Sequence, residues 1–478
     1  MPTGIIIVGL GPGHPDHLTI EAHRVLSSAS EVYTRTSRHP TLTNLNLPTK
    51  IVSFDEVYER AATFADVYSE IAERIVELGS RPQGVVFAVP GHPLAGEEST
   101  RQILELASEK SLTVRVVEGI SFIDSVCALL GVDPLAGLQV GDATELALRH
   151  HSQFSPDLPL LVGQLYDRSL ASDVKLLLMA VYPDDHRVSL VRAAGTVEAK
   201  VTHVPLYALD RDEMVDHLTS LYVPPLSEPG SVASFQELVA HLRAPDGCPW
   251  DREQTHSTLR PYLLEETYEV LQALDGENAD ALADELGDLL LQILLHSQIA
   301  TEDGEFRMRD VVAHSINKLT HRHPHVFGNV EVSSAGDVLV NWEQIKRDER
   351  ASQPRGAGLD RISLAMPALL RAQALQERAA RAGFEWQGID QVVCMVEEHW
   401  DQLMRAPEEE RSHELGDLLF ALVNLARWFK VDAESALREA MVRFEARFTQ
   451  MERVCTARDK VLRDLTPDEW RDLWVQCR

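Results

Sequence analysis

The chain has 478 residues, enough for about three domains. Its 45 Lys and Arg against 74 Asp and Glu give a net charge of −29, which argues against a broad face for nucleic acid polymers or anionic membranes. Nucleotides are not excluded, because a metal ion can bridge an acidic protein and an acidic ligand. The five cysteines form no CxxC pair and the most apolar stretches are too short to cross a bilayer, so we expect a reduced, cytoplasmic protein.

Residues 1–225 predict an α/β domain with a mostly parallel sheet. Short β-branched runs, several of them ended by Gly or Pro, alternate here with segments of helical periodicity. Strands are expected at 5–8, 85–89 and 114–117, further strands at 158–162, 175–181 and 203–206, and helices at 18–29 and 65–78.

Glycines follow three of these strands. Gly9, Gly11 and Gly13 follow the first, Gly91 the second and Gly119 the third. Glycine lets a ligand approach the backbone closely, although a plain tight turn explains any one of them equally well. The first loop lacks both the GK[ST] ending of a P-loop and the third glycine of a dinucleotide fingerprint.

Together the loops VGLGPG, AVPGHP and VEGIS resemble those of the tetrapyrrole (corrin/porphyrin) methylases, over about residues 4–222. The resemblance implies that these loops surround S-adenosylmethionine, with Gly11, Gly91, His92, Gly119 and Ser121 as the corresponding residues. The family usually has Gly-Asp-Pro in the second loop, and here His92 takes the place of Asp. This departure counts against ordinary methylase chemistry, and the sequence does not identify a methyl acceptor.

Beyond the first domain the sequence becomes helical and repeats itself. The motif ELGDLL occurs at 285–290 and again at 414–419, each preceded by a Glu-Glu pair, which indicates an internal duplication. Proline- and glycine-rich breaks separate the parts. The expected organisation is an α/β domain at 1–225, a linker at 226–234, an all-α first copy at 235–351, a linker at 352–361 and an all-α second copy at 362–478.

The first copy places four acids in a pattern typical of a metal site. Glu266 and Glu269 share one helix face, and Glu285 and Asp288 repeat that spacing on the next helix, after a turn at 275–278. Paired antiparallel, the helices would bring four carboxylates together, which favours Mg²⁺, or Mn²⁺, and a polyphosphate ligand. A solvated acidic face is less favoured, because the acids interrupt the apolar stripe instead of lying opposite it.

EExxE followed by ExxD is the metal motif of the all-α nucleoside triphosphate pyrophosphohydrolases, and the surrounding sequence resembles the MazG family. The matching segments are GCPWD at 247–251, LEETYE at 264–269, ELGDLL at 285–290, RHPHVF at 322–327 and WEQIK at 342–346. The resemblance covers about residues 235–478. It implies hydrolysis of an NTP or dNTP to the monophosphate and pyrophosphate by helical-bundle domains of a homodimer. The apolar run at 289–295 gives a separate reason to expect a partner.

The resemblance also implies roles for individual residues. Glu266, Glu269, Glu285 and Asp288 would hold the metal, and Glu265 would orient or deprotonate the water. Arg322 and Lys346 would bind the phosphates, and Lys318, which lies one helical turn before Arg322, would assist them. Trp250 would stack on the base, or else pack structurally. The candidate catalytic residues are therefore Glu265, Glu266 and Glu269.

The second copy departs from this pattern. Its counterparts are Glu398, Asp401, Glu414 and Asp417, with Asp401 one methylene shorter than the expected Glu. Two interpretations stay open: both copies are active, or a weakened second copy mainly builds the dimer. For the whole chain the leading hypothesis is an NTP pyrophosphohydrolase. The alternatives are an S-adenosylmethionine-dependent tetrapyrrole methyltransferase and a ligand-sensing scaffold with inactive helical domains.

Overall fold

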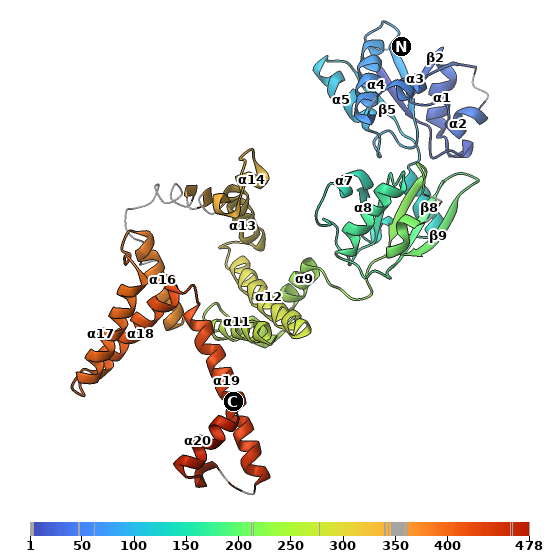
Figure 1. Ribbon diagram of the computed structural model, residues 1–478. Helices are drawn as coiled ribbons and strands as arrows, with labels where there is room; N and C mark the ends of the chain where they lie inside the picture. Colours follow the sequence, from blue (N-terminus) through green and yellow to red (C-terminus); the bar gives the residue numbers. More distant parts are fainter. Residues whose placement is uncertain are drawn as a thin grey trace. The chain divides into compact units, whose positions relative to one another are not determined.

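The computed structural model contains two compact units, Met1–Glu253 and Gln254–Arg478 (Figure 1). The first unit holds all the described strands, and the described part of the second is helical. The structure describes residues 4–45, 48–61, 63–211, 213, 215–276, 278–338, 341–342, 344–345, 359, 362–458, 460 and 462–477.

Five parallel strands form the first sheet, in the order β3-β2-β4-β1-β5. This confirms the parallel α/β arrangement predicted from the β-branched runs. The elements are β1 Ile5–Gly9, α1 Ile20–Ser28, β2 Glu31–Thr34, α2 Pro40–Asn44, β3 Lys50–Ser53, α3 Asp55–Arg60, α4 Phe64–Gly79, β4 Val85–Val89, α5 Glu98–Glu109, β5 Val114–Val117 and α6 Phe122–Leu130.

Strand β4 shows why these runs are almost wholly apolar. All five of its residues are buried, because the sheet is covered on both faces. Val85, Phe87 and Val89 belong to one core cluster, which includes residues of α4. Val86 and Ala88 alternate with them and belong to a second cluster, with residues of α1.

A second sheet of five strands follows in the same unit, in the order β6-β7-β10-β8-β9. Only β6 and β7 are parallel, and the other three pairings are antiparallel, which the sequence patterns did not predict. The elements are β6 Gln139–Asp142, α7 Ala143–Ala147, β7 Leu160–Gly163, α8 Arg168–Met179, β8 Arg187–Arg192, β9 Lys200–Pro205 and β10 Thr219–Val223.

The strand predicted at 175–181 is wrong, because most of this segment lies in helix α8. Asp167 caps the helix, its carboxylate accepting a hydrogen bond from the Leu170 N–H at 2.8 Å. Val174, Leu177 and Leu178 are buried at i, i+3 and i+4, so the apolar run is one face of a helix. The strands expected at 158–162 and 203–206 are present, displaced by one to three residues.

The described residues after β10 are mostly helical, as predicted. Among the described residues, no helix combines the length and apolar character that a membrane crossing requires. The helices are α9 Val232–Arg243 and α10 Pro249–Glu253 in the first unit, and in the second α11 Arg260–Asp275, α12 Ala279–Glu302, α13 Met308–Arg322, α14 Pro324–Phe327, α16 Ala368–Arg381, α17 Ile389–Arg405, α18 Arg411–Trp428, α19 Ala433–Ala457 and α20 Pro467–Gln476.

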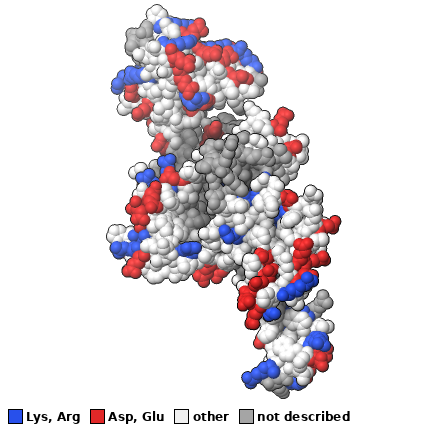
Figure 2. Space-filling view, turned by 90° about the vertical axis from the view of Figure 1, so that its left-hand side faces the viewer, with Lys and Arg blue, Asp and Glu red and all other residues white. Residues whose placement is uncertain are grey.

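The surface charge agrees with the composition. On the face shown in Figure 2, Lys and Arg side chains are scattered among Asp and Glu and do not gather into a broad basic area. That face offers no stripe of cations of the kind that tracks a nucleic acid backbone.

Candidate functional site

Helices α11 and α12 form a packed pair joined by a short turn. The Asn278 side chain caps α12, its Oδ1 accepting hydrogen bonds from the Asp280 and Ala281 N–H groups at 3.1 and 3.2 Å. Because the connection is so short, α12 folds back along α11, and the middle of α11 lies beside the N-terminal half of α12. This places the two acidic segments of the first copy together.

The structure brings three of the predicted acids into one cluster. Glu266 from α11 and Glu285 and Asp288 from α12 each offer a carboxylate oxygen, and these atoms lie within 4.8 Å of one another. Glu266 and Glu285 are partly buried and Asp288 is exposed. Glu269, one turn after Glu266, lies close enough to interact with both Glu266 and Glu285.

The charges in this cluster repel one another. The pKa of Glu266 is raised, first by partial burial and then by the Asp288 charge and the interaction with Glu269. The pKa of Glu285 is raised in the same direction, by loss of hydration and by the charges of Glu269, Asp284 and Asp288. A hard divalent cation with oxygen ligands offsets such repulsion, so the residues present fit Mg²⁺.

The other predicted residues of the first copy lie outside this cluster. Glu265 is exposed on α11, next to Glu266. Lys318 and Arg322 lie one turn apart on α13, the helix that follows α12. Trp250 lies on α10 in the first unit, with 53% of its surface exposed. Lys346 lies outside the described residues.

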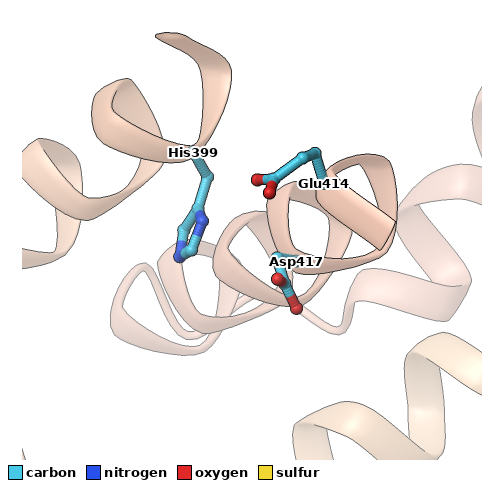
Figure 3. A group of neighbouring side chains, drawn as sticks. All are labelled: His399, Glu414 and Asp417. Carbon is cyan, nitrogen blue, oxygen red and sulfur yellow. The ribbon is translucent and has the colours of Figure 1, made fainter. Parts of the chain in front are cut away.

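The second copy repeats the helix pair as α17 and α18, but a different set of side chains comes together. His399, Glu414 and Asp417 place their ligand atoms within 4.8 Å of one another (Figure 3). The predicted acids Glu398 and Asp401 are not members of this cluster. Asp401 instead pairs with Arg405 one turn along α17, with Nη2 and Oδ2 2.9 Å apart.

His399 is therefore a candidate that the sequence reasoning missed. The signal was present, since the motif Glu-Glu-His-Trp-Asp has an imidazole where the first copy has Thr267. What the sequence could not show is that the His399 side chain joins Glu414 and Asp417 in one cluster.

In the first unit, the three glycine loops meet where β4, β1 and β5 end. These strands are neighbours and parallel, so their carboxyl ends lie at one edge of the sheet. The Gly11 N–H donates to the Gly91 carbonyl at 3.2 Å, and the Gly91 N–H donates back to Gly11 at 2.8 Å. The space beside Gly91 is open, because a Cβ there would meet no described atom within 4 Å.

Gly119→Ala is expected to destabilise the first unit by about 1–3 kcal/mol. A Cβ at Gly119 would lie 2.4 Å from the Gly91 carbonyl oxygen and 2.9 Å from the Gly9 carbonyl carbon, and backbone atoms cannot move aside cheaply. Denaturant unfolding of the full chain measures the change. Gly416→Ala, in an open position on α18, is the control and should be neutral or slightly stabilising. Equal stability of the two variants would contradict this close crossing of loops.

The remaining residues of these loops have clear local roles. Ser121 caps α6, accepting a hydrogen bond from the Ile123 N–H at 3.1 Å. The His92 Nδ1 accepts a hydrogen bond from the Leu94 N–H at 3.1 Å, which is the turn that an Asp side chain commonly makes. His92 thus reproduces the local hydrogen bond of the family's usual Asp without its negative charge.

Two protein families match separate parts of the chain. Residues 4–210 match the tetrapyrrole (corrin/porphyrin) methylases, and residues 254–327 match the MazG nucleotide pyrophosphohydrolase domain.

Curated relatives match the whole chain or half of it. An uncharacterised protein of Bacillus subtilis, YabN, is 39% identical over 99% of this chain and 98% of its own length. A nucleoside triphosphate pyrophosphohydrolase of Escherichia coli is 43% identical over 50% of this chain and 94% of its own length. A nucleoside triphosphate pyrophosphohydrolase/pyrophosphatase MazG of Thermotoga maritima is 42% identical over 51% of this chain and 95% of its own length.

Among solved structures, uroporphyrin-III C-methyltransferase of Thermus thermophilus is similar over 47% of this chain and 93% of its own. Its TM-score is 0.37 and its sequence identity 19%.

Proposed function

Since the chain belongs to the MazG family and carries a tetrapyrrole methylase-like domain ahead of the MazG part, we propose that it is a Mg²⁺-dependent pyrophosphohydrolase. Its substrates would be nucleoside or deoxynucleoside triphosphates, and its products the monophosphate and pyrophosphate. The observation that carries the proposal is the cluster of Glu266, Glu285 and Asp288 between α11 and α12.

The acids of the first copy divide into two roles. Glu266, Glu285 and Asp288, with Glu269 beside them, would hold Mg²⁺. When bound, the ion supplies positive charge that neutralises the triphosphate oxygens. Glu265 is exposed and adjacent to the cluster, so its carboxylate is free to accept a proton from the attacking water or to orient it.

Cationic side chains complete the proposed site. Lys318 and Arg322 follow the acidic helix pair in the chain, and their charges would offset the negative charge that develops on the departing pyrophosphate. Lys346 is proposed for the same task.

We assign catalysis to the first copy. Its cluster consists of carboxylates alone, which suits Mg²⁺, whereas the second-copy cluster contains an imidazole.

Product analysis tests the proposed reaction. The full chain is incubated with Mg²⁺ and a panel of NTPs and dNTPs, and each product is separated and quantified. The proposal requires monophosphate and pyrophosphate in equal amounts. Release of the diphosphate and inorganic phosphate would contradict it, and so would the absence of any cleavage across the panel.

We further propose that the methylase-like domain binds S-adenosylmethionine. The crossing of Gly11 and Gly91 and the open space beside Gly91 support this, because they let a ligand approach the backbone. Calorimetric titration with S-adenosylmethionine and S-adenosylhomocysteine tests it. If methyl transfer to a tetrapyrrole were detected without nucleotide hydrolysis, the alternative methyltransferase function would be favoured.

A homodimer is part of the proposal. Large apolar side chains stay exposed at matching positions of both copies: Tyr268 and Trp400, Leu286 and Leu415, and Ile293 and Leu422. Within the run at 289–295, Leu294 and Leu295 are already buried inside the chain. The exposed set extends over both helix pairs, as expected of a surface that a second copy covers. Sedimentation of the full chain should give twice the chain mass, and a monomer would exclude this arrangement.

The proposed domain boundaries are those expected from the sequence, with linkers at 226–234 and 352–361. We also propose a reducing, cytoplasmic setting, which is supported by the five cysteines, all of them free thiols.

A further inference from the structure

The cluster in the second copy differs in kind from the one in the first. His399 on α17 directs its imidazole toward Glu414 and Asp417 on α18, and the three ligand atoms lie within 4.8 Å of one another (Figure 3). The His399 Nδ1 is buried and has no hydrogen-bond partner among the described residues. All three side chains are half-buried between the helices.

The duplication supplies a direct comparison. Thr267 is the counterpart of His399 in the first copy, and its hydroxyl donates to the Leu263 carbonyl of its own helix at 2.7 Å. The first-copy ligand set therefore contains carboxylate oxygens alone. In the second copy an imidazole nitrogen has taken the place that Glu266 occupies in the first.

Two of the four acids expected from the family motif, Glu398 and Asp401, lie outside this cluster. Glu398 and Asp401 line a shallow hollow of about 470 Å³ together with Arg405 and Glu414. Within it Asp401 pairs with Arg405. The motif's first two acids thus do not form the metal cluster, although they lie close to it.

We propose that the second copy binds a divalent transition-metal ion, of the Zn²⁺ and Co²⁺ class, through His399, Glu414 and Asp417. Imidazole nitrogen favours these ions over Mg²⁺, which prefers oxygen ligands. Acidic side chains on neighbouring helices often lie close without an ion. Here a second observation is that the His399 Nδ1 is buried without a hydrogen-bond partner among the described residues, because a buried polar atom left unpaired costs free energy that a ligand bound to it would recover.

A second histidine lies at the edge of this site. The His413 Nε2 is 3.5 Å from the Asp417 carboxylate, one turn earlier on α18, and its side chain is 79% exposed. It is placed to orient Asp417 or to add a further nitrogen ligand. An ion bound by ligands from both α17 and α18 would stabilise the packing of the two helices. This site is independent of the hydrolysis proposed for the first copy.

Cobalt absorption tests the proposal on the full chain. Metal-free protein is titrated with Co²⁺ in the presence of excess Mg²⁺, which occupies the oxygen-only cluster of the first copy. We expect one equivalent of Co²⁺ to bind with the visible absorption of a nitrogen-ligated ion, and Zn²⁺ to displace it. Displacement of Co²⁺ by Mg²⁺ would overturn the proposal.

Variants assign the ligands. His399→Thr, which installs the first-copy residue, should weaken Co²⁺ binding at least about tenfold, and Glu414→Gln should do the same. Glu266→Gln in the first copy and His150→Thr at an exposed position of the other unit are the controls and should leave the titration unchanged. Far-ultraviolet circular dichroism verifies that each variant is folded. Wild-type Co²⁺ affinity in folded His399→Thr would overturn the assignment of His399. Because hydrolysis is not the readout, failure of this site and failure of the proposed function are distinguishable.

Discussion

Glu266→Gln is expected to abolish nucleotide hydrolysis while leaving the metal-free protein at least as stable as the wild type. The substitution removes a central negative charge of the cluster and replaces a carboxylate ligand with a neutral amide. Loss of metal-dependent charge stabilisation should lower kcat/KM by about 10³-fold. In the metal-free protein the same change removes a carboxyl whose pKa is raised by partial burial and by the neighbouring Asp288 and Glu269, so it relieves both costs.

Two measurements on the same samples check this prediction. Steady-state hydrolysis with Mg²⁺ gives kcat/KM, and thermal unfolding in chelator gives the metal-free melting temperature. Glu398→Gln, at the matching position of the second copy, is the control and should retain activity. A Glu266→Gln enzyme that keeps a tenth or more of wild-type activity would contradict the assignment. A variant that simply unfolds would show a lowered melting temperature and so be recognised.

The stabilisation of the protein by Mg²⁺ is expected to grow with pH. The pKa values of Glu266 and Glu285 are raised, so the metal-free folded state binds protons at these carboxyls more tightly than the unfolded state does. Their contribution to stability is therefore present at low pH and is lost as the pH rises through the raised pKa values. Mg²⁺ then replaces the missing protons and offsets the repulsion.

Thermal unfolding with and without saturating Mg²⁺ measures this effect. The rise in melting temperature should be small at about pH 5, where protons compete for the carboxylates, and largest at about pH 8. Glu266→Gln should show a smaller rise and a weaker dependence on pH. A rise that is the same at both pH values in the wild type would mean that these carboxyls are not the site of binding.

Much of the fold could be predicted because buried segments have recognisable patterns of apolar residues. The strand Val85–Val89 is buried on both faces, so it had to be a continuous apolar run between turn residues. The same rule misled at 175–181, since this short apolar run is the end of a helix whose polar positions lie earlier in the chain, at 168–175. The antiparallel pairing in the second sheet depends on contacts between distant segments, which local patterns do not encode.

The helix pair of the first copy was predictable for similar reasons. Acids three residues apart lie on one helix face, and a short turn between the helices forces the faces together. Only the direction of side chains escaped prediction. In the second copy the pairing of α17 with α18 brings His399 together with Glu414 and Asp417 of the opposite helix. Which side chains of α17 face α18 depends on the rotation of each helix about its own axis. That rotation is set by the packing of the helices.

The most direct test of the central claim is to locate the metal and the nucleotide together. Crystals of the full chain grown with Mn²⁺ and a non-hydrolysable triphosphate analogue would give an anomalous signal at each manganese ion. The account predicts manganese between Glu266, Glu285 and Asp288, in contact with oxygens of the triphosphate. Nucleotide bound at another place, with no metal on these three acids, would contradict it.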